Sequence, residues 1–264
     1  MIFVSHSGPD TWVARQIARE IEARGATPFL DEAQVDAGAD FEEDILQFLQ
    51  KAHELVVLLT PWALDRPYVW AEIGAAWGRR IPIVALLPGI TATELQTRPG
   101  IPVLLKKRDL LELNDVDVLS EAVRGPRATR RRMTAMGKPS VFISHSARDA
   151  DWARLFAEAL IERGVTVWID DIDVRPGESL RDALESGMRG SDVLVALVDP
   201  EYPAKPNLFF EIGAAIGMGK KVVSIVPKGL DPNNLPLDVR LRRYLIRDSP
   251  EQTAEELSNT LVAA

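Results

Sequence analysis

Two glutamates at matching places in a repeated stretch are the residues best suited to chemistry in this chain. Glu72 lies in VWAEIGAAWG and Glu211 lies 139 positions later in FFEIGAAIGMG. A Ser-His-Ser sequence recurs with the same offset, as Ser5-His6-Ser7 and Ser144-His145-Ser146. A carboxylate, an imidazole and hydroxyl groups repeated at one spacing indicate a ligand-binding site that is present twice.

A structural explanation exists for each of these groups. A glutamate in the first turn of a helix is stabilised by the helix dipole. His6 and His145 can be ordinary loop histidines, and two further repeated acids, Asp31 and Asp170, can cap turns. The copies differ at most other positions, so the recurrence of the glutamate beside Ser-His-Ser favours a functional role. For the run that follows each glutamate, Gly-Ala-Ala, we expect close packing of the helix on a sheet.

The spacing extends over a whole domain. Residues 3–88 align with residues 142–227 without a gap, so the chain is a tandem duplication. Between the copies lies GPRATRRRMTAMGKPS, which is rich in Gly, Pro and Arg. We therefore predict a first domain over 1–124, a basic linker over 125–138 and a second domain over 139–264.

Strands alternate with helices in each copy. Helical periodicity covers 10–24 and 149–163, and each of these segments is followed by a glycine that suits a helix C-cap. LVVLLT and VLVALV are continuous apolar runs, as expected of central strands buried on both faces. Pro67 and Pro206 suit the first turn of the next helix. The fold class predicted is α/β, with two flavodoxin-like three-layer domains, each around a five-stranded, mostly parallel sheet of order 2-1-3-4-5.

That strand order predicts where the chemical groups meet. Ligands of open α/β sheets bind outside the carboxyl ends of the strands, where the strand order reverses between strands one and three. The residues expected to converge are Ser5, His6, Ser7, Asp31 and Glu72 in the first copy, and Ser144, His145, Ser146, Asp170 and Glu211 in the second. Nearby helix N-termini suit a phosphate-bearing ligand.

Composition excludes several other functions. The net charge of −8 lacks the excess of basic residues typical of nucleic-acid binding. The absence of cysteine, with only three histidines, argues against a transition-metal site. GMGKK does not have the spacing of a P-loop, and adjacent Ser, His and Ser residues make no catalytic triad. No secretory signal or membrane span is evident from the pattern, so we expect a cytoplasmic protein that does not bind membranes.

Taken in order, these motifs resemble the Toll/interleukin-1 receptor (TIR) domain in its bacterial form. FVSHSGPD and FISHSARD open the first strand of each copy, WIDDIDVRPGESL follows strand two, and the glutamate lies on the third helix. KPNLFFEIGAAIGMGKKV is also similar to TIR-like nucleotide-binding proteins and nucleoside deoxyribosyltransferases.

The resemblance implies cleavage of NAD, with Glu72 and Glu211 as the essential glutamates. NAD is then the substrate, and no metal is required. The positive charge that develops on the ribose needs one nearby carboxylate, because nicotinamide leaves as a neutral base. Hydrolysis to ADP-ribose and cyclisation both remain open. Many bacterial relatives have a Trp four residues before the glutamate, where this chain has Tyr68 and Asn207, expected to line the site.

The resemblance also implies partners and regulation. Other TIR domains are the expected partners, through self-assembly, in bacterial immune signalling. The loops after strand two, over 31–40 and 170–179, are expected to gate the site against a neighbouring copy, with Gly38 and Gly177 supplying backbone freedom. The altered aromatic position keeps a non-catalytic TIR–TIR scaffold open as an alternative. A nucleoside deoxyribosyltransferase-like enzyme is a second alternative.

Overall fold

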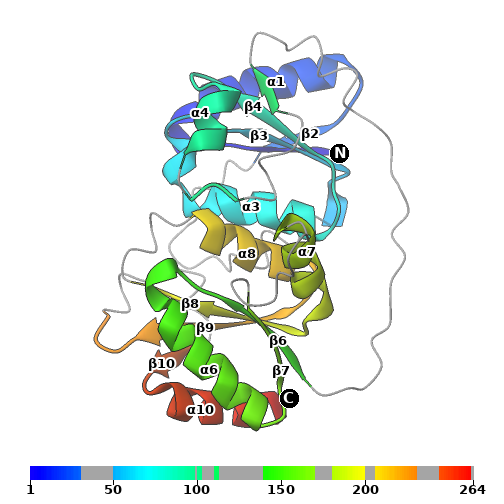
Figure 1. The fold of residues 1–264 in the computed structure, drawn as a ribbon. Coiled ribbons are helices and arrows are strands. Elements are labelled where there is room, and N and C mark those ends of the chain that lie inside the picture. Colours follow the sequence, from blue (N-terminus) through cyan, green and yellow to red (C-terminus); the bar gives the residue numbers. More distant parts are fainter. Residues whose placement is uncertain are drawn as a thin grey trace. The chain divides into compact units, whose positions relative to one another are not determined.

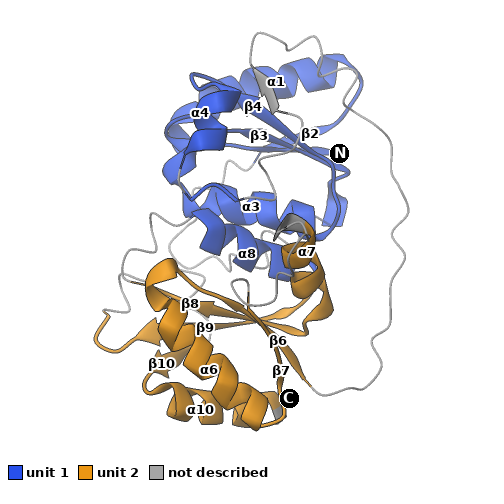
Figure 2. Ribbon diagram, viewed as in Figure 1, with its two compact units in different colours: residues 1–130, 203–218 blue, residues 131–202, 219–264 orange. Residues whose placement is uncertain are grey.

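The chain divides into two compact units (Figures 1 and 2). Unit 1 comprises residues 1–130 with 203–218, and unit 2 comprises 131–202 with 219–264. The structure, a computed structural model, describes residues 1–30, 50–98, 100–102, 110–112, 139–169, 180–199, 206–230 and 244–262. Helix α8 (Pro206–Gly217) comes from the second sequence repeat but is part of unit 1, as its colour in Figure 2 shows. The domain boundaries at 124 and 139 stay predictions.

Unit 1 contains a five-stranded sheet of order β2-β1-β3-β4-β5, with all pairings parallel. Its strands are β1 (Ile2–Ser5), β2 (Pro28–Leu30), β3 (Glu54–Leu58), β4 (Ile83–Leu87) and β5 (Leu110–Glu112). Its helices are η1 (Gly8–Asp10), α1 (Thr11–Ala23), η2 (Ala63–Asp65), α3 (Pro67–Gly78), α4 (Ala92–Thr97) and α8. Helices α1 and α3 cover opposite faces of the sheet, which gives the predicted three layers (Figure 1).

Unit 2 repeats the same sheet, in the order β7-β6-β8-β9-β10, again all parallel. Its strands are β6 (Ser140–Ser144), β7 (Thr166–Ile169), β8 (Val193–Leu197), β9 (Lys221–Pro227) and β10 (Leu245–Arg247). Its helices are η4 (Ala147–Asp149), α6 (Ala150–Glu162), α7 (Leu180–Gly190) and α10 (Pro250–Val262). The predicted fold class and strand order are confirmed in both units.

Local sequence explains where these elements begin and end. Helices α3 and α8 start at Pro67 and Pro206, where a missing N–H costs no hydrogen bond. Helix α1 ends in a Schellman motif: Gly25 has φ +83° and donates to Glu22 O, while Ala26 N donates to Ile21 O at 3.2 Å. Helix α6 ends in the same way at Gly164, which has φ +81°. The predicted glycine caps are therefore confirmed.

Both cores join the sheet to the helices on one of its faces. In unit 1, α1 packs Ile17 and Ile21 against strand residues such as Val56. In unit 2, α6 and α10 pack Phe156 and Leu257 against β6, β8 and β9. Strands β3 and β8 are buried along their whole length, as their apolar runs predict. Among the described residues, no helix has the length and apolar character needed to cross a membrane.

One buried group at the amino end of β3 conflicts with its surroundings. Glu54 is 2% exposed, and its Oε1 has no hydrogen-bond partner within the described part of the chain. Burial raises the pKa of Glu54 to about 7. The matching position of the second copy carries Val193, which is buried in β8 without this conflict. Glu54 is thus a polar residue at an apolar position of the fold.

We predict that Glu54→Val stabilises the protein at alkaline pH. A carboxyl group whose pKa is raised on folding contributes stability that is complete below its ordinary pKa near 4.5 and is lost as the pH rises through about 7. The gain from the substitution is therefore up to about 3 kcal/mol larger at pH 8 than at pH 4.5. Urea denaturation at the two pH values measures it. An equal gain at both would contradict the assignment.

Candidate functional site

A serine and a glutamate meet at the carboxyl end of the unit 1 sheet. Ser5 is the last residue of β1, and its Oγ donates a hydrogen bond to Oε2 of Glu72 on α3. Ser5 is 1% exposed and Glu72 is 2% exposed. The structure thus brings together two residues that are 67 positions apart, at the strand switch point where they are expected. Their chemical roles stay predictions.

Glu72 does not lie in the first turn of its helix, contrary to the expectation from sequence. It is the sixth residue of α3, which starts at Pro67, and no acidic residue occupies the first turn. Helix-dipole stabilisation fades within the first turn, so it does not explain this carboxylate. Every residue from Val69 to Gly78 is buried, which makes Glu72 the one charged group in an apolar stretch. Such burial is costly unless a partner compensates, and its presence here marks a candidate functional group.

The hydroxyl of Ser7 supports the loop after β1. Ser7 Oγ donates to Oδ2 of the buried Asp10, and Thr60 Oγ1 donates to the same oxygen at 2.6 Å. Thr60 Oγ1 also accepts from Ala63 N at 3.1 Å, so the loops after β1 and β3 are joined. His6 lies partly exposed between Ser5 and Ser7, with its Nδ1 3.4 Å from Val4 O. Ser7 therefore holds the loop, and of the three residues Ser5, His6 and Ser7 it is His6 that solvent reaches.

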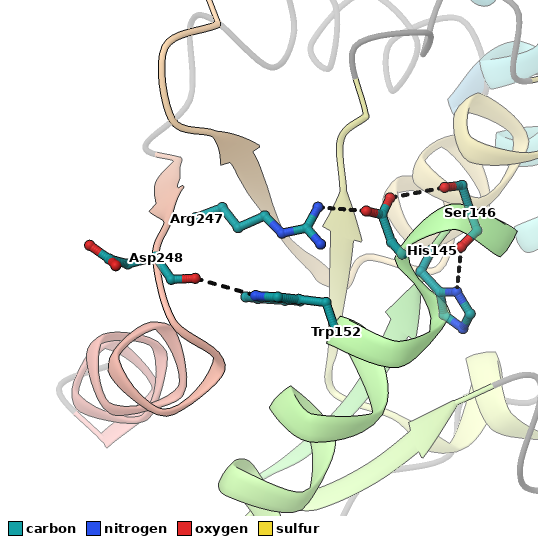
Figure 3. Close-up of polar contacts among 6 residues, drawn as sticks. His145, Ser146, Trp152, Arg247 and Asp248 are labelled. Atoms are coloured by element: carbon teal, nitrogen blue, oxygen red, sulfur yellow. Dashed lines mark hydrogen bonds and ion pairs between the residues drawn. The ribbon is translucent and has the colours of Figure 1, made fainter.

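Unit 2 builds the corresponding loop with a different partner (Figure 3). Ser146 Oγ donates to Asp149 Oδ2 at 2.9 Å, as Ser7 does to Asp10. The second partner of Asp149 is Arg247, whose Nη1 lies 2.6 Å from Oδ1. His145 Nδ1 is 2.9 Å from Ser146 O. The Arg247 guanidinium, on the edge strand β10, is thus the second partner of this aspartate, as the Thr60 hydroxyl is in unit 1.

Arg247 also packs on an aromatic ring. Its guanidinium carbon is 4.4 Å from the centroid of Trp152, and Trp152 stacks on Phe156 with centroids 5.0 Å apart. The indole Nε1 donates to Asp248 O at 3.3 Å, which joins α6 to the segment after β10 (Figure 3). Sequence reasoning missed this arginine. The available signal was position 199, where the second copy has an aspartate in place of Thr60, so the hydroxyl that partners Asp10 is missing and Asp149 needs another partner.

The other predicted residues fall into three groups. Asp31, Asp170 and the loops 31–40 and 170–179, with Gly38 and Gly177, lie outside the described residues. Tyr68 is partly buried and Asn207 is exposed, each being the second residue of its helix. Ser144 ends β6 in unit 2 and is buried, whereas Glu211 is partly buried on α8 in unit 1. Convergence of Glu211 with Ser144 stays a prediction.

The glycines of the repeated motif do not pack on a sheet as expected. A β-carbon on Gly74 would lie 2.8 Å from the carbonyl carbon of Phe210 on α8, closer than β-carbons approach other atoms in real structures. One on Gly213 would lie 2.6 Å from the carbonyl carbon of Ala71 on α3. The absence of a side chain therefore permits close contact between two helices inside unit 1, which corrects the helix–sheet interpretation.

Fold and site together define a tandem α/β protein with a buried glutamate at the carboxyl end of its first sheet. The chain belongs to the TIR domain family, since the family model described as TIR domain matches residues 2–121 and 141–261.

Two curated relatives carry enzymatic names. The chain is 26% identical over 137 residues to the 2′ cyclic ADP-D-ribose synthase AbTIR of Acinetobacter baumannii, covering 47% of this chain and 51% of that protein. It is 38% identical over 79 residues to the NAD(+) hydrolase PdTIR of Paracoccus denitrificans, covering 30% of this chain and 26% of that protein. The chain thus spans about half, or less, of the length of these relatives.

A solved TIR structure is also similar. The TIR domain of the Toll-related receptor TRR-2 from Hydra magnipapillata is 19% identical, with a TM-score of 0.34, and the match covers 45% of this chain and 88% of that one. The assignment to the family depends on the family model, which matches both halves of the chain.

We predict that Arg247→Met destabilises the protein by about 3 kcal/mol, because it leaves a mostly buried carboxylate without its cation. The side chains of Arg247 and Asp149 are 19% and 10% exposed. Adding Asp149→Asn should recover part of the loss, since the uncompensated charge is then gone. The measurement is the free energy of unfolding of the two single variants and the double variant.

The matched control is Arg154→Met. Arg154 pairs with Asp151 at 3.5 Å, with side-chain exposures of 51% and 96%. The substitution should therefore lower the free energy of unfolding by well under about 1 kcal/mol. Equal losses of unfolding free energy for the two arginine variants would show that the pair of Arg247 with Asp149 stabilises the protein no more than an exposed pair.

Proposed function

We propose that this protein cleaves NAD at the bond between nicotinamide and ribose, with Glu72 and Glu211 as the essential carboxylates. The observation that carries the proposal is the buried Glu72, held by Ser5 at the switch point of a TIR sheet. The names of the relatives, a cyclic ADP-ribose synthase and an NAD hydrolase, support the substrate class. Both names describe a reaction that begins by breaking the same bond.

The required chemistry suits a single glutamate. Departure of neutral nicotinamide leaves positive charge on the ribose, and a nearby carboxylate stabilises that charge or binds the ribose hydroxyls. The Ser5 hydroxyl fixes one carboxylate oxygen, so the group is oriented before substrate arrives. Water then captures the ribosyl cation to give ADP-ribose, or a nucleophilic atom of the same molecule captures it to give a cyclic product.

The burial of Glu72 also bears on regulation. At 2% exposure, Glu72 is reached by a ribose only when part of the surrounding structure moves. We propose that self-assembly with other TIR domains favours the open form, in a cytoplasmic immune response of a bacterium. The loops 31–40 and 170–179 remain the predicted gates.

We predict that Glu72→Gln with Glu211→Gln abolishes nicotinamide release, lowering kcat on the order of 10² to 10³-fold or more. Each single variant should keep the activity of the other site. Glutamine preserves the shape of the side chain and removes its charge, so circular dichroism should show an unchanged fold. Release of nicotinamide from NAD by the purified protein is the measurement.

The matched control for this series is Glu54→Gln. Glu54 is equally buried in unit 1 but lies at the amino end of β3, away from the site, so activity should be retained. A double variant with full activity would refute the assignment of the glutamates. A wild type with no turnover in any assembled state would favour the scaffold, and release of free base from a deoxynucleoside alone would favour a deoxyribosyltransferase-like enzyme.

We further predict that activity depends on assembly. Specific activity should rise more than in proportion to protein concentration, because open sites form in the assembled state. Activity assays and light scattering across a dilution series test this. Constant activity per molecule from a strictly monomeric protein would leave the chemistry standing and remove the assembly step.

A further inference from the structure

Helices α3 and α8 approach each other closely along a reciprocal set of contacts within unit 1. A β-carbon on Gly74 would crowd the backbone of Phe210, and one on Gly213 would crowd that of Ala71. The same reciprocal contacts recur one turn later, where a β-carbon on Gly78 would crowd the backbone of Ala214 and one on Gly217 would crowd that of Ala75. Phe210 and Ala71 are themselves 139 positions apart, as are Ala214 and Ala75. The pair therefore has the exchange symmetry of an isologous contact.

The contacts fall on the peptide bonds of the two glutamates. The carbonyl of Ala71 belongs to the peptide that joins it to Glu72, and Gly213 packs on that carbonyl. The carbonyl of Phe210 belongs to the peptide that joins it to Glu211, and Gly74 packs on that one. Each glutamate is thus held, at its own backbone, by the glycine of the other helix.

We infer that Gly213 is a positioning residue for Glu72, so that the second sequence repeat sets the geometry of the first site. This inference rests on the proposed NAD cleavage. With α8 against it, α3 is buried from Val69 to Gly78, and the rings of Trp77 and Phe210 add a contact at 5.6 Å between centroids. Close-packed interiors transmit displacement, so a shift of α8 at Gly213 moves the Ala71–Glu72 peptide.

Positioning at this precision affects rate more than binding. The carboxylate has to stay where charge develops on the ribose, and a displacement near 1 Å at such a group can cost on the order of 10²-fold. Two of the contacts that hold Glu72 are the Ser5 hydroxyl at its side chain and Gly213 at its backbone. If the contact with Gly213 is disturbed, the hydrogen bond from Ser5 has to hold the carboxyl group against the shift of its backbone.

The test compares two glycines in a chain where only the first site works. In a Glu211→Gln background, Gly213→Ala places its β-carbon 2.6 Å from the carbonyl carbon of Ala71, and Gly217→Ala places it 2.8 Å from that of Ala75. The two collisions are similar, so the melting temperature should fall by a similar amount. Only the first lies on the peptide of Glu72. We expect kcat to fall on the order of 10²-fold for Gly213→Ala, with KM little changed, and far less for Gly217→Ala.

Phe210→Leu provides a variant without a collision. It loosens the ring contact with Trp77 and should lower kcat while the chain stays folded, so the test survives if Gly213→Ala does not fold. An equal loss of kcat for both glycine variants, or no loss for Gly213→Ala and Phe210→Leu, would overturn the positioning role while leaving the proposed function intact.

A second readout does not depend on turnover. In ¹⁵N-serine-labelled protein, the backbone amide signal of Ser5 is sensitive to a change in the neighbouring bond between the Ser5 Oγ and Glu72. It should move in Gly213→Ala and stay in place in Gly217→Ala. If Glu72 proves to have no catalytic activity but the Ser5 signal moves as expected, the proposed function fails and the mechanical link stands. An unchanged Ser5 signal in Gly213→Ala would contradict the coupling between Gly213 and Glu72.

Discussion

A glutamate in the middle of a helix that is buried from Val69 to Gly78 is the constraint on which unit 1 depends. Burying such a group costs free energy unless hydrogen bonds compensate. The Ser5 hydroxyl supplies one hydrogen bond. It can do so because β1 lies beside β3 at the centre of the sheet, and β3 is the strand that precedes α3 in the chain. The close contact with α8 completes the burial of α3 without adding a polar group. The repeated motif EIGAA therefore meets two demands at once, a glutamate for the site and a glycine for the neighbouring helix.

The two copies show how one fold accepts two solutions to the same problem. The aspartate after the first strand is buried in both, as Asp10 and Asp149, and takes a serine hydroxyl in both. Its second partner is the Thr60 hydroxyl in one unit and the Arg247 guanidinium in the other. A hydroxyl brings no opposite charge to the carboxylate, whereas the guanidinium brings one and joins β10 to the loop. The loops carrying His6 and His145 are therefore built alike but held differently.

Sequence predicted the features that follow from periodicity and topology. Strand order placed Ser5 and Glu72 at one switch point, and their hydrogen bond agrees. Periodicity could not tell which surface the glycine face of α3 packs on, since a small apolar face fits a sheet or a helix equally well. Arg247 was missed because an ion pair across 98 positions leaves no local pattern. Glu72 was misplaced although Pro67 had been assigned to the first turn of the same helix, because a residue five positions after that proline already lies in the second turn.

The symmetry of the helix pair limits how assembly can proceed. Contacts that exchange equivalent residues, Gly213 with Ala71 and Gly74 with Phe210, are those of a two-fold pair, and such a pair closes on itself. Joining two repeats in one chain makes this contact intramolecular and so independent of protein concentration. Growth into a larger assembly then has to use other surfaces, because these two helix faces already cover each other. In the proposed mechanism, a concentration-dependent step and a concentration-independent support for Glu72 therefore coexist in one protein, the first acting on access to the site and the second on its geometry.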